Sequence, residues 1–163
     1  MSTVYLGIGT NLGDREANIQ KALGFLKEDK EIEVQAVSSM IETDPVGGPP
    51  QGKFLNGAVK IRTDLLPLEL LSRLKAVERR LGRTGSHGKN QPRPMDLDIL
   101  LYDDVVFEGK NLAIPHPRLA ERLFALEPLA EIAPDLAHPK SGRPIRELVA
   151  SLRHEAPPQP ETT

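Results

Sequence analysis

The sequence of 163 residues contains no cysteine, and only 4% of its residues are aromatic. Without cysteine, the chain can form neither disulfide bonds nor thiolate zinc sites, and it has no thiolate nucleophile. The formal net charge is only −2 at pH 7, so we expect no bulk electrostatic attraction to nucleic acid or to an anionic membrane. Any binding of anions must therefore come from local clusters of basic residues.

The sequence also lacks long apolar runs and a recognisable leader. No apolar run approaches the roughly 20 residues of a membrane-spanning helix. The N-terminal residues do not combine a basic segment with a long apolar segment, as a secretory signal would. Hydrophobic residues make up 39% and charged residues 27% of the chain, which is ordinary for a soluble globular protein. We therefore expect a cytoplasmic protein with no membrane partner.

A third absence concerns nucleotide binding. The chain has neither a P-loop motif nor the set of kinase signature motifs, so any ATP phosphates must be held by side chains and a metal ion. A near match to the dinucleotide-binding fingerprint, with Gly7, Gly9 and Gly13, follows the first apolar segment. We discount it, because the strands expected at 32–43 and 54–63 follow one another without the crossover helix that a parallel sheet needs.

Hydrophobic periodicity predicts the elements of the fold. Asp14 is a plausible N-cap of a first helix, and Pro67 stands near the start of a second helix at 68–81. In the second helix, the residues expected to face the core are Leu71, Leu74, Val77 and Leu81. The remaining elements expected are strands at 4–8, 32–43, 54–63 and 93–102, a small hairpin around 105–107 and 112–114, and short helices at 119–132 and 145–152.

The order β-α-β-β-α-β predicts an α+β fold of the ferredoxin-like type, with a mainly antiparallel sheet. Because further elements follow this unit, we expect helices on both faces of the sheet, in three layers. We expect a single domain over residues 1–154. Residues 155–163 include three prolines and no large apolar residue, so we expect a disordered tail there.

The most informative segment is the run RPMDLDILLY at residues 93–102. Its apolar residues at 97, 99 and 101 alternate with their neighbours, as on a strand. Asp96 and Asp98 would therefore point to the same face, about 6.5–7 Å apart. Two carboxylates at that spacing repel each other and resist desolvation, and a bound Mg²⁺ removes both costs. A solvated strand face with an ion pair explains the D-x-D pattern alone equally well.

Basic side chains lie near these carboxylates in the sequence and could meet phosphate groups. A solvated basic loop is the alternative, more so for Lys89 than for Arg93. The candidates are Arg83, Lys89 and Arg93 before the strand, and His116, Arg118 and Arg122 after the hairpin. A purely structural histidine is as plausible for His116, which stands between two prolines. Glu78 lies at the edge of a buried helix face, where a boundary residue is at least as plausible as a functional one.

The loop at 43–52 and the following run FLN at 54–56 could form a pocket for a flat heterocycle. An aromatic face allows stacking, and a buried Asn offers both a donor and an acceptor to a ring edge. The chain has only four Phe and two Tyr, so the positions of Phe54 and Phe124 are informative. Either ring could also belong to the core.

Together these motifs resemble those of the 6-hydroxymethyl-7,8-dihydropterin pyrophosphokinase family of folate biosynthesis. The resemblance covers about residues 3–152, with the motifs in the family's order. They are GTNLG at 9–13, TDPVG at 43–47, FLN at 54–56, PRPMDLDIL at 92–100, PHPR at 115–118, R-x-F at 122–124, PL at 128–129 and IAP at 132–134. The combination of PRPMDLDIL and PHPR is highly specific for this family.

The resemblance implies transfer of the β,γ-pyrophosphoryl group of MgATP to the hydroxymethyl oxygen of the pterin, with release of AMP. It implies a monomer that binds two small molecules and no nucleic acid, and two Mg²⁺ ions held by Asp96 and Asp98. The residues that would act in catalysis are Arg83, Arg93, Asp96 and Asp98. Those that would bind ATP are Glu78, Arg93, Ile99, His116, Arg118 and Arg122. Those that would bind the pterin are Thr43, Asp44, Val46, Phe54, Asn56 and Phe124.

The chain departs from the family's pattern in one loop, where Gly85, Lys89 and Asn90 replace arginines and a tryptophan. Two other functions remain as alternatives. A palm-type nucleotidyltransferase also places D-x-D on a ferredoxin-like sheet, but the net charge of −2 does not favour a nucleic-acid surface. A ferredoxin-like RNA-binding module would expose aromatic residues on its central strands, where this chain has acids.

Overall fold

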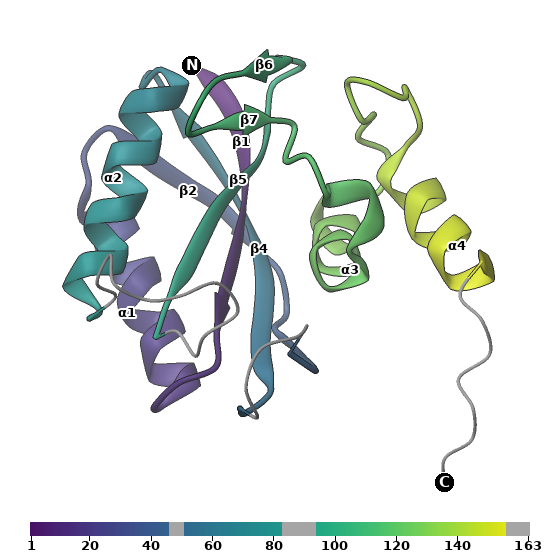
Figure 1. Cartoon of the computed structure of the whole chain (residues 1–163). Helices are drawn as coiled ribbons and strands as arrows, with labels where there is room; N and C mark the ends of the chain where they lie inside the picture. Colours follow the sequence, from purple (N-terminus) through teal and green to yellow (C-terminus); the bar gives the residue numbers. More distant parts are fainter. Residues whose placement is uncertain (46–50, 83–93, 156–163) are drawn as a thin grey trace, which may run out of the picture.

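A computed structural model of the chain describes residues 1–45, 51–82 and 94–155 (Figure 1). The tail expected to be disordered therefore lies, apart from its first residue, outside the described residues. None of the helices in the described part is long and apolar enough to cross a membrane.

A five-stranded sheet forms the centre of the fold. Its strands are β1 (Ser2–Thr10), β2 (Ile32–Val37), β3 (Ile41–Thr43), β4 (Phe54–Thr63) and β5 (Asp96–Tyr102). They lie in the order β2-β4-β1-β5, with β3 paired to β4, and each of these pairings is antiparallel. This order confirms the ferredoxin-like fold and excludes the parallel sheet of a dinucleotide-binding unit.

Helices cover both faces of the sheet, as expected (Figure 1). On one face lie α1 (Arg15–Glu28) and α2 (Pro67–Arg80), and the N-cap of α1 is Asp14, whose carboxylate accepts from the Ala17 backbone N–H. On the other face lies α3 (Leu123–Ile132), and α4 (Ile145–Glu155) packs against it. The strands β6 (Phe107–Glu108) and β7 (Ala113–Ile114) form the small hairpin, and a 3₁₀ turn, η1 (Leu119–Glu121), precedes α3.

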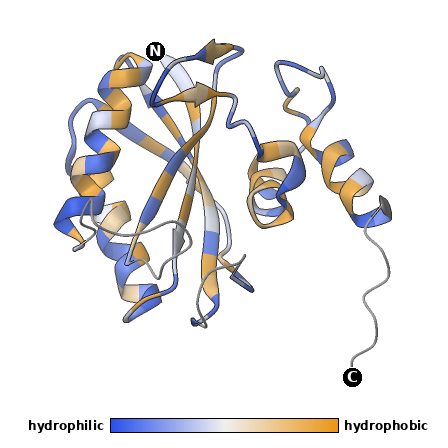
Figure 2. Ribbon diagram, viewed as in Figure 1, coloured by the Kyte–Doolittle hydropathy of each residue, from blue (hydrophilic) through white to orange (hydrophobic). Residues whose placement is uncertain are grey.

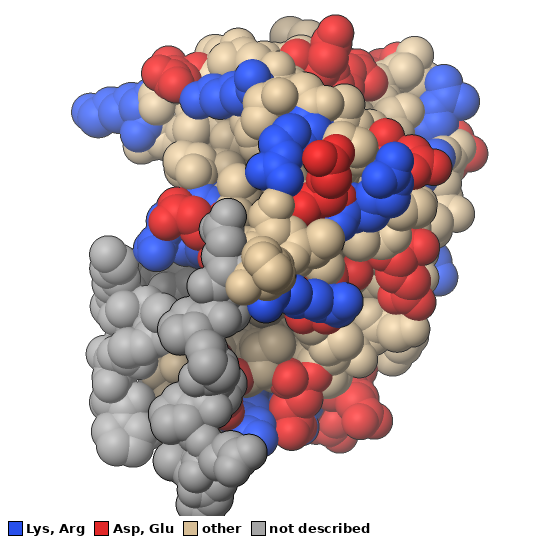
Figure 3. Space-filling model, turned by 90° about the vertical axis from the view of Figure 1, so that its right-hand side faces the viewer, with Lys and Arg blue, Asp and Glu red and all other residues tan. Residues whose placement is uncertain are grey.

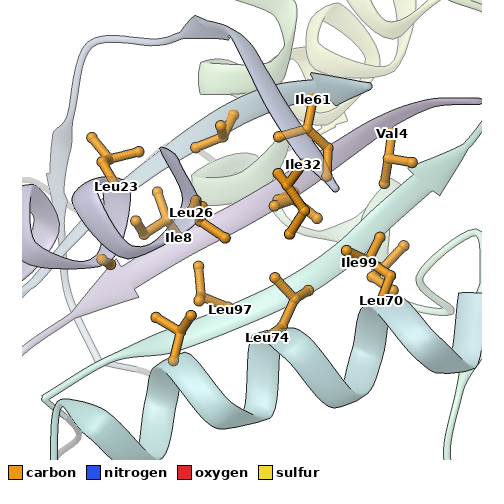
Figure 4. Close-up of a cluster of buried hydrophobic side chains, with 14 of the residues drawn as sticks. Val4, Ile8, Leu23, Leu26, Ile32, Ile61, Leu70, Leu74, Leu97 and Ile99 are labelled. Atoms are coloured by element: carbon orange, nitrogen blue, oxygen red, sulfur yellow. The ribbon is translucent and has the colours of Figure 1, made fainter. Parts of the chain in front are cut away.

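Each face of the sheet has its own hydrophobic core. Between the sheet and α1 and α2, buried residues such as Leu26, Leu74 and Leu97 pack together (Figure 4). Between the sheet and α3, a second cluster joins Leu100 and Leu126 and extends to α4. The mainly hydrophobic colouring of α3 in Figure 2 fits its position between the sheet and α4. Burial of both faces of the sheet holds β1 and β5 firmly in place.

The expectation of one continuous strand at 32–43 is wrong, because the chain forms β2 and β3 with a break at residues 38–40. At the break, the Ser38 hydroxyl accepts a hydrogen bond from the Ala58 backbone N–H at 2.8 Å. The side chain of Met40 lies over Gly57, where an added Cβ would come within 2.4 Å of it. At the break, these side-chain contacts therefore stand beside one remaining backbone hydrogen bond, from the Ser38 N–H to the Ala58 carbonyl at 2.9 Å.

Two helices also differ from expectation. In α2, the buried residues are Leu70, Leu74, Val77 and Glu78, so Leu71 and Leu81 lie at the edge of the buried stripe and not in its middle. The helix expected at 119–132 is interrupted at Arg122, whose backbone is extended (φ −116°, ψ 95°) between η1 and α3.

Candidate active site

The two aspartates of β5 share one face of the sheet, as the alternation predicted. Both line the same pocket, and the core residues Leu97 and Ile99 point to the opposite face. On the neighbouring strand β1, Asp96 is paired with Gly9 and Asp98 with Gly7. Because these partners carry no side chain, other side chains approach the backbone there: Leu100 lies over Gly7, and the Asn56 amide lies over Gly9.

The pocket has a volume of about 580 Å³ and lies where β1, β4 and β5 meet the segment from residue 116 to residue 127. It gathers residues that are far apart in the sequence. Among the residues predicted for the site, it brings together Thr43, Asp44, Phe54, Asn56, Asp96, Asp98, His116, Arg118, Arg122 and Phe124.

The environment of Asp98 disfavours the ionised form of its carboxyl group. Burial, the charge of Asp96 and that of Glu78 raise the pKa of Asp98 from 3.8 to about 7, against the smaller opposing effects of Arg122 and Lys75. A divalent cation between the carboxylates would remove this cost. Nowhere in the described part of the chain do three or more His, Asp or Glu side chains gather to hold a metal ion. The pair therefore fits a cation such as Mg²⁺, which takes its other ligands from phosphates and water.

We expect Asp98→Asn to stabilise the metal-free protein, and more so at high pH. The folded pKa of about 7 exceeds the unfolded value of 3.8, so the folded state holds the extra proton between about pH 4 and 7, and stability falls as pH rises through that window. The substitution should raise the free energy of unfolding by about 2–3 kcal/mol more at pH 8 than at pH 5. Urea unfolding of both proteins with EDTA measures it; a gain independent of pH would contradict the raised pKa.

His116 is held in a defined orientation beside the carboxylates. Its backbone N–H donates to the Leu100 carbonyl at 3.0 Å, and its Nδ1 accepts from the Arg118 backbone N–H at 3.2 Å. Burial and the neighbouring charge of Arg122 lower the pKa of His116. A neutral imidazole that accepts at Nδ1 carries its proton on Nε2, so this nitrogen is a hydrogen-bond donor suited to a phosphate oxygen.

The interruption between η1 and α3 places Arg122 and Phe124 in the pocket together. The Arg122 guanidinium carbon lies 5.4 Å from the centroid of the Phe124 ring, within range of a cation–π interaction. Both side chains line the pocket, and the charge of Arg122 also reaches Asp98. Arg122 thus lies between an aromatic surface and a pair of acids.

The other end of the pocket is formed by β3 and β4. The Asn56 side chain is 8% exposed, and its Nδ2 donates to the Thr43 hydroxyl at 2.5 Å. Its Oδ1 lies close to Gly9, where an added Cβ would come within 2.5 Å of that oxygen. With Phe54 lining the same pocket, this end combines an aromatic ring and a fixed amide, as expected for a flat heterocycle.

The structure does not bring every predicted residue into this pocket. Glu78 and Ile99 are 2% and 3% exposed and belong to the side of the sheet that α2 covers. Val46, Arg83 and Arg93 lie outside the described residues.

Sequence reasoning missed two acids, Glu121 and Glu127, which also line the pocket. Glu127 follows Phe124 by one helical turn, and this i, i+3 spacing was the available signal. Glu127 also forms an ion pair with Arg153 of α4, which ties the pocket wall to the last helix.

Comparison with known proteins agrees with the geometry. Residues 5–134 match the model of the family described as 7,8-dihydro-6-hydroxymethylpterin-pyrophosphokinase (HPPK). The chain belongs to the HPPK family. It is 46% identical over 147 residues to a 2-amino-4-hydroxy-6-hydroxymethyldihydropteridine pyrophosphokinase of Aquifex aeolicus, with 90% of each chain covered. It is 48% identical over 128 residues to the protein of the same name from Bacillus subtilis, with 78% of this chain and 76% of the relative covered.

Solved structures of HPPK-DHPS proteins share the fold of this HPPK-family chain. A Plasmodium falciparum HPPK-DHPS variant with SDX-DHP gives a TM-score of 0.73 at 17% sequence identity, with 92% of this chain and 45% of that chain covered. The chain thus spans less than half the length of that protein. The likeness shows that the two proteins share one fold.

Proposed function

We propose that this HPPK-family chain transfers pyrophosphate from MgATP to the hydroxymethyl group of 6-hydroxymethyl-7,8-dihydropterin. The products are the pterin diphosphate and AMP, in a step of folate biosynthesis. The observation that carries the proposal is a single pocket with two different ends. One end holds an acidic pair with basic neighbours, and the other holds an aromatic ring and a buried amide.

At the acidic end, Asp96 and Asp98 would hold two Mg²⁺ ions together with the triphosphate. Bound Mg²⁺ supplies neutralisation of the charge on the phosphate oxygens as the pyrophosphoryl group is transferred. The Nε2–H of His116 donates to a phosphate oxygen, and the guanidinium groups of Arg118 and Arg122 attract the triphosphate into the pocket. Asp96 and Asp98 are the side chains proposed to accept the proton of the hydroxymethyl group, and bound Mg²⁺ would ease the loss of that proton.

Four further nucleotide and loop assignments follow from the family resemblance. Arg93 is proposed to hold phosphates, with Arg83 assisting in catalysis. For Ile99, the proposed ATP contact is limited to the backbone, because its side chain lies in the core. Glu78, which the resemblance assigns to ATP binding, is buried behind β5.

At the other end, Phe54 and Phe124 would stack on the two faces of the pterin. The amide of Asn56 and the polar groups of Thr43 and Asp44 would read the edge of the heterocycle, with Val46 assigned to the same site by the resemblance. Phosphoryl-type transfer depends on alignment and charge neutralisation more than on covalent catalysis. A pocket that fixes both substrates at once meets that requirement.

The proposal includes a cytoplasmic, monomeric enzyme, since ATP is its co-substrate and the two proposed binding ends belong to one pocket of one chain. The nucleic-acid alternatives find little support on the face formed by α3 and α4, where basic and acidic side chains are interspersed (Figure 3). A net charge of −2 agrees with this.

The decisive experiment incubates the protein with ATP, Mg²⁺ and 6-hydroxymethyl-7,8-dihydropterin and separates the products. We expect AMP and the pterin diphosphate in equal amounts, and no AMP when the pterin is omitted. Release of free pyrophosphate with transfer of AMP would instead indicate a nucleotidyltransferase. Formation of ADP would indicate single phosphoryl transfer, and either result overturns the proposal.

We expect Gly9→Ala to weaken pterin binding about tenfold, because the new methyl group would displace the Asn56 amide from its position against Thr43. Calorimetric titration with the pterin measures this. Gly24→Ala is the matched control, since nothing lies within 4 Å of a Cβ at this α1 position, and the substitution should stabilise the helix. Unchanged pterin affinity in Gly9→Ala would show that the Asn56 amide does not bind the pterin ring.

A further inference from the structure

The strand that carries the two aspartates lies at the edge of the sheet. In the order β2-β4-β1-β5, β5 is paired on one side with β1. On its outer side, alternate backbone groups of β5 point away from the sheet and need other partners. The positions of Asp96 and Asp98 therefore depend on what holds this outer edge.

Glu78 of α2 is one of these partners. Its Oε2 accepts a hydrogen bond from the backbone N–H of Leu97, the residue between the two aspartates, at 2.8 Å. The Glu78 side chain is almost fully enclosed, and Lys75 lies 3.5 Å from its other oxygen. A carboxylate that accepts from a backbone N–H in a buried place makes a strong, charge-assisted bond.

A second partner holds the outer edge on the other side of Asp98. There the Leu100 carbonyl accepts from the backbone N–H of His116 at 3.0 Å. The outer edge of β5 is therefore attached both before and after Asp98, once by a side chain of α2 and once by the segment that follows β7.

The location of Glu78 is costly for a carboxylate. Glutamate is rarely fully buried, and Glu78 lies in the last turn of α2, where the helix dipole disfavours negative charge. The apolar residues Leu70, Leu74 and Val77 occupy the rest of the buried stripe. A leucine at position 78 would continue that stripe but would leave the Leu97 N–H without this acceptor.

We propose that Glu78 is a positioning residue for the metal-binding carboxylates. By holding the Leu97 N–H, it fixes the rotation of β5 about its axis, so that Asp96 and Asp98 both face the pocket. The inference rests on the proposed function, because it takes the two aspartates as metal ligands. It differs from a direct contact with ATP, since Glu78 acts from the far side of the strand.

Two substitutions of Glu78 distinguish its role as a hydrogen-bond acceptor from the effect of its negative charge. Glu78→Gln retains an oxygen that can accept from Leu97, whereas Glu78→Leu keeps the approximate size and removes the acceptor. Leu70→Val is the control for loss of packing on α2, since Leu70 is fully buried near the other end of the helix. Thermal unfolding establishes that each variant is folded before it is compared.

The first readout is the binding of Mn²⁺ alone, measured by electron paramagnetic resonance. We expect Glu78→Leu to weaken it at least tenfold, and Glu78→Gln and Leu70→Val to stay within about threefold of the original chain. Amide hydrogen exchange of Leu97 should accelerate only in Glu78→Leu. In the steady state, kcat should fall in Glu78→Leu while the KM for ATP changes less than threefold.

Three results would overturn the inference. Equal losses in Glu78→Gln and Glu78→Leu would mean that the charge matters and not the acceptor. Normal Mn²⁺ binding with a raised KM for ATP in both variants would mean a nucleotide contact. Normal behaviour of Glu78→Leu would mean no role at all. Mn²⁺ binding and amide exchange need no turnover, so a chain that forms no AMP but shows the expected pattern would refute the proposed function and leave the role of Glu78 intact.

Discussion

Replacing either aspartate of β5 with alanine is expected to reduce AMP formation by about a thousandfold or more while the fold persists. Each carboxylate is proposed to hold a metal ion against the triphosphate, and without it the charge that develops during transfer is no longer neutralised. The fold should persist because both side chains line a pocket and contribute little to either core. In Asp96→Ala, loss of the neighbouring charge also removes part of the effect that, after burial, raises the pKa of Asp98.

The measurement is the rate of AMP release from ATP at saturating Mg²⁺ and pterin, beside circular dichroism of each variant. Asp104→Ala is the matched control, because Asp104 is an exposed aspartate just beyond β5. It should leave the rate unchanged. Near-normal turnover in Asp96→Ala or Asp98→Ala would remove the metal hypothesis, and with it the explanation of the paired acids.

The sequence predicted the metal strand because the alternation of side chains holds from Asp96 to Ile99. Beyond Ile99 a bulge breaks it, so Leu101, expected on the face of Leu97 and Ile99, packs with Leu100 in the second core. Once the apolar residues of β5 were assigned to the core, the side-chain period of two required Asp96 and Asp98 to share a face. The structure has the pair in one pocket with His116 and Arg122. The sequence also predicted that the two carboxylates resist burial, but not the added effect of the Glu78 charge on the pKa of Asp98 nor the glycines opposite the pair, because these depend on the packing of α2 and on the pairing of β5 with β1.

Predictions failed where tertiary contacts override local pattern. The helical periodicity of residues 119–132 is nearly continuous, and nothing in it indicates the extended backbone at Arg122. That break separates η1 from α3 at the point where Arg122 meets the pocket. Glu78 is a similar case. In the sequence, a carboxylate beside an apolar stripe resembles a solvated boundary residue, and only the folded structure shows that it accepts from the Leu97 N–H.

Phe124→Ala is expected to weaken binding of the pterin by roughly 10- to 100-fold. Phe124 lines the pocket on the first turn of α3 and lies beside Arg122, whereas Phe54 approaches from β4. Loss of the ring removes one stacking face and the apolar area it buries on the ligand. It leaves the acidic end of the pocket in place, so the affinity for a non-hydrolysable ATP analogue with Mg²⁺ should change less than threefold.

Calorimetric titration with the pterin, in the presence of that analogue, measures the effect. Phe107→Ala is the matched control, because Phe107 is a partly buried phenylalanine of β6 that packs on the first core and does not line the pocket. Its pterin affinity should be unchanged even if its stability falls. Phe124→Leu should be intermediate, because leucine retains apolar contact but has no aromatic face. Equal pterin affinity in all three variants would refute stacking by α3 and leave β4 as the only wall that recognises the ring.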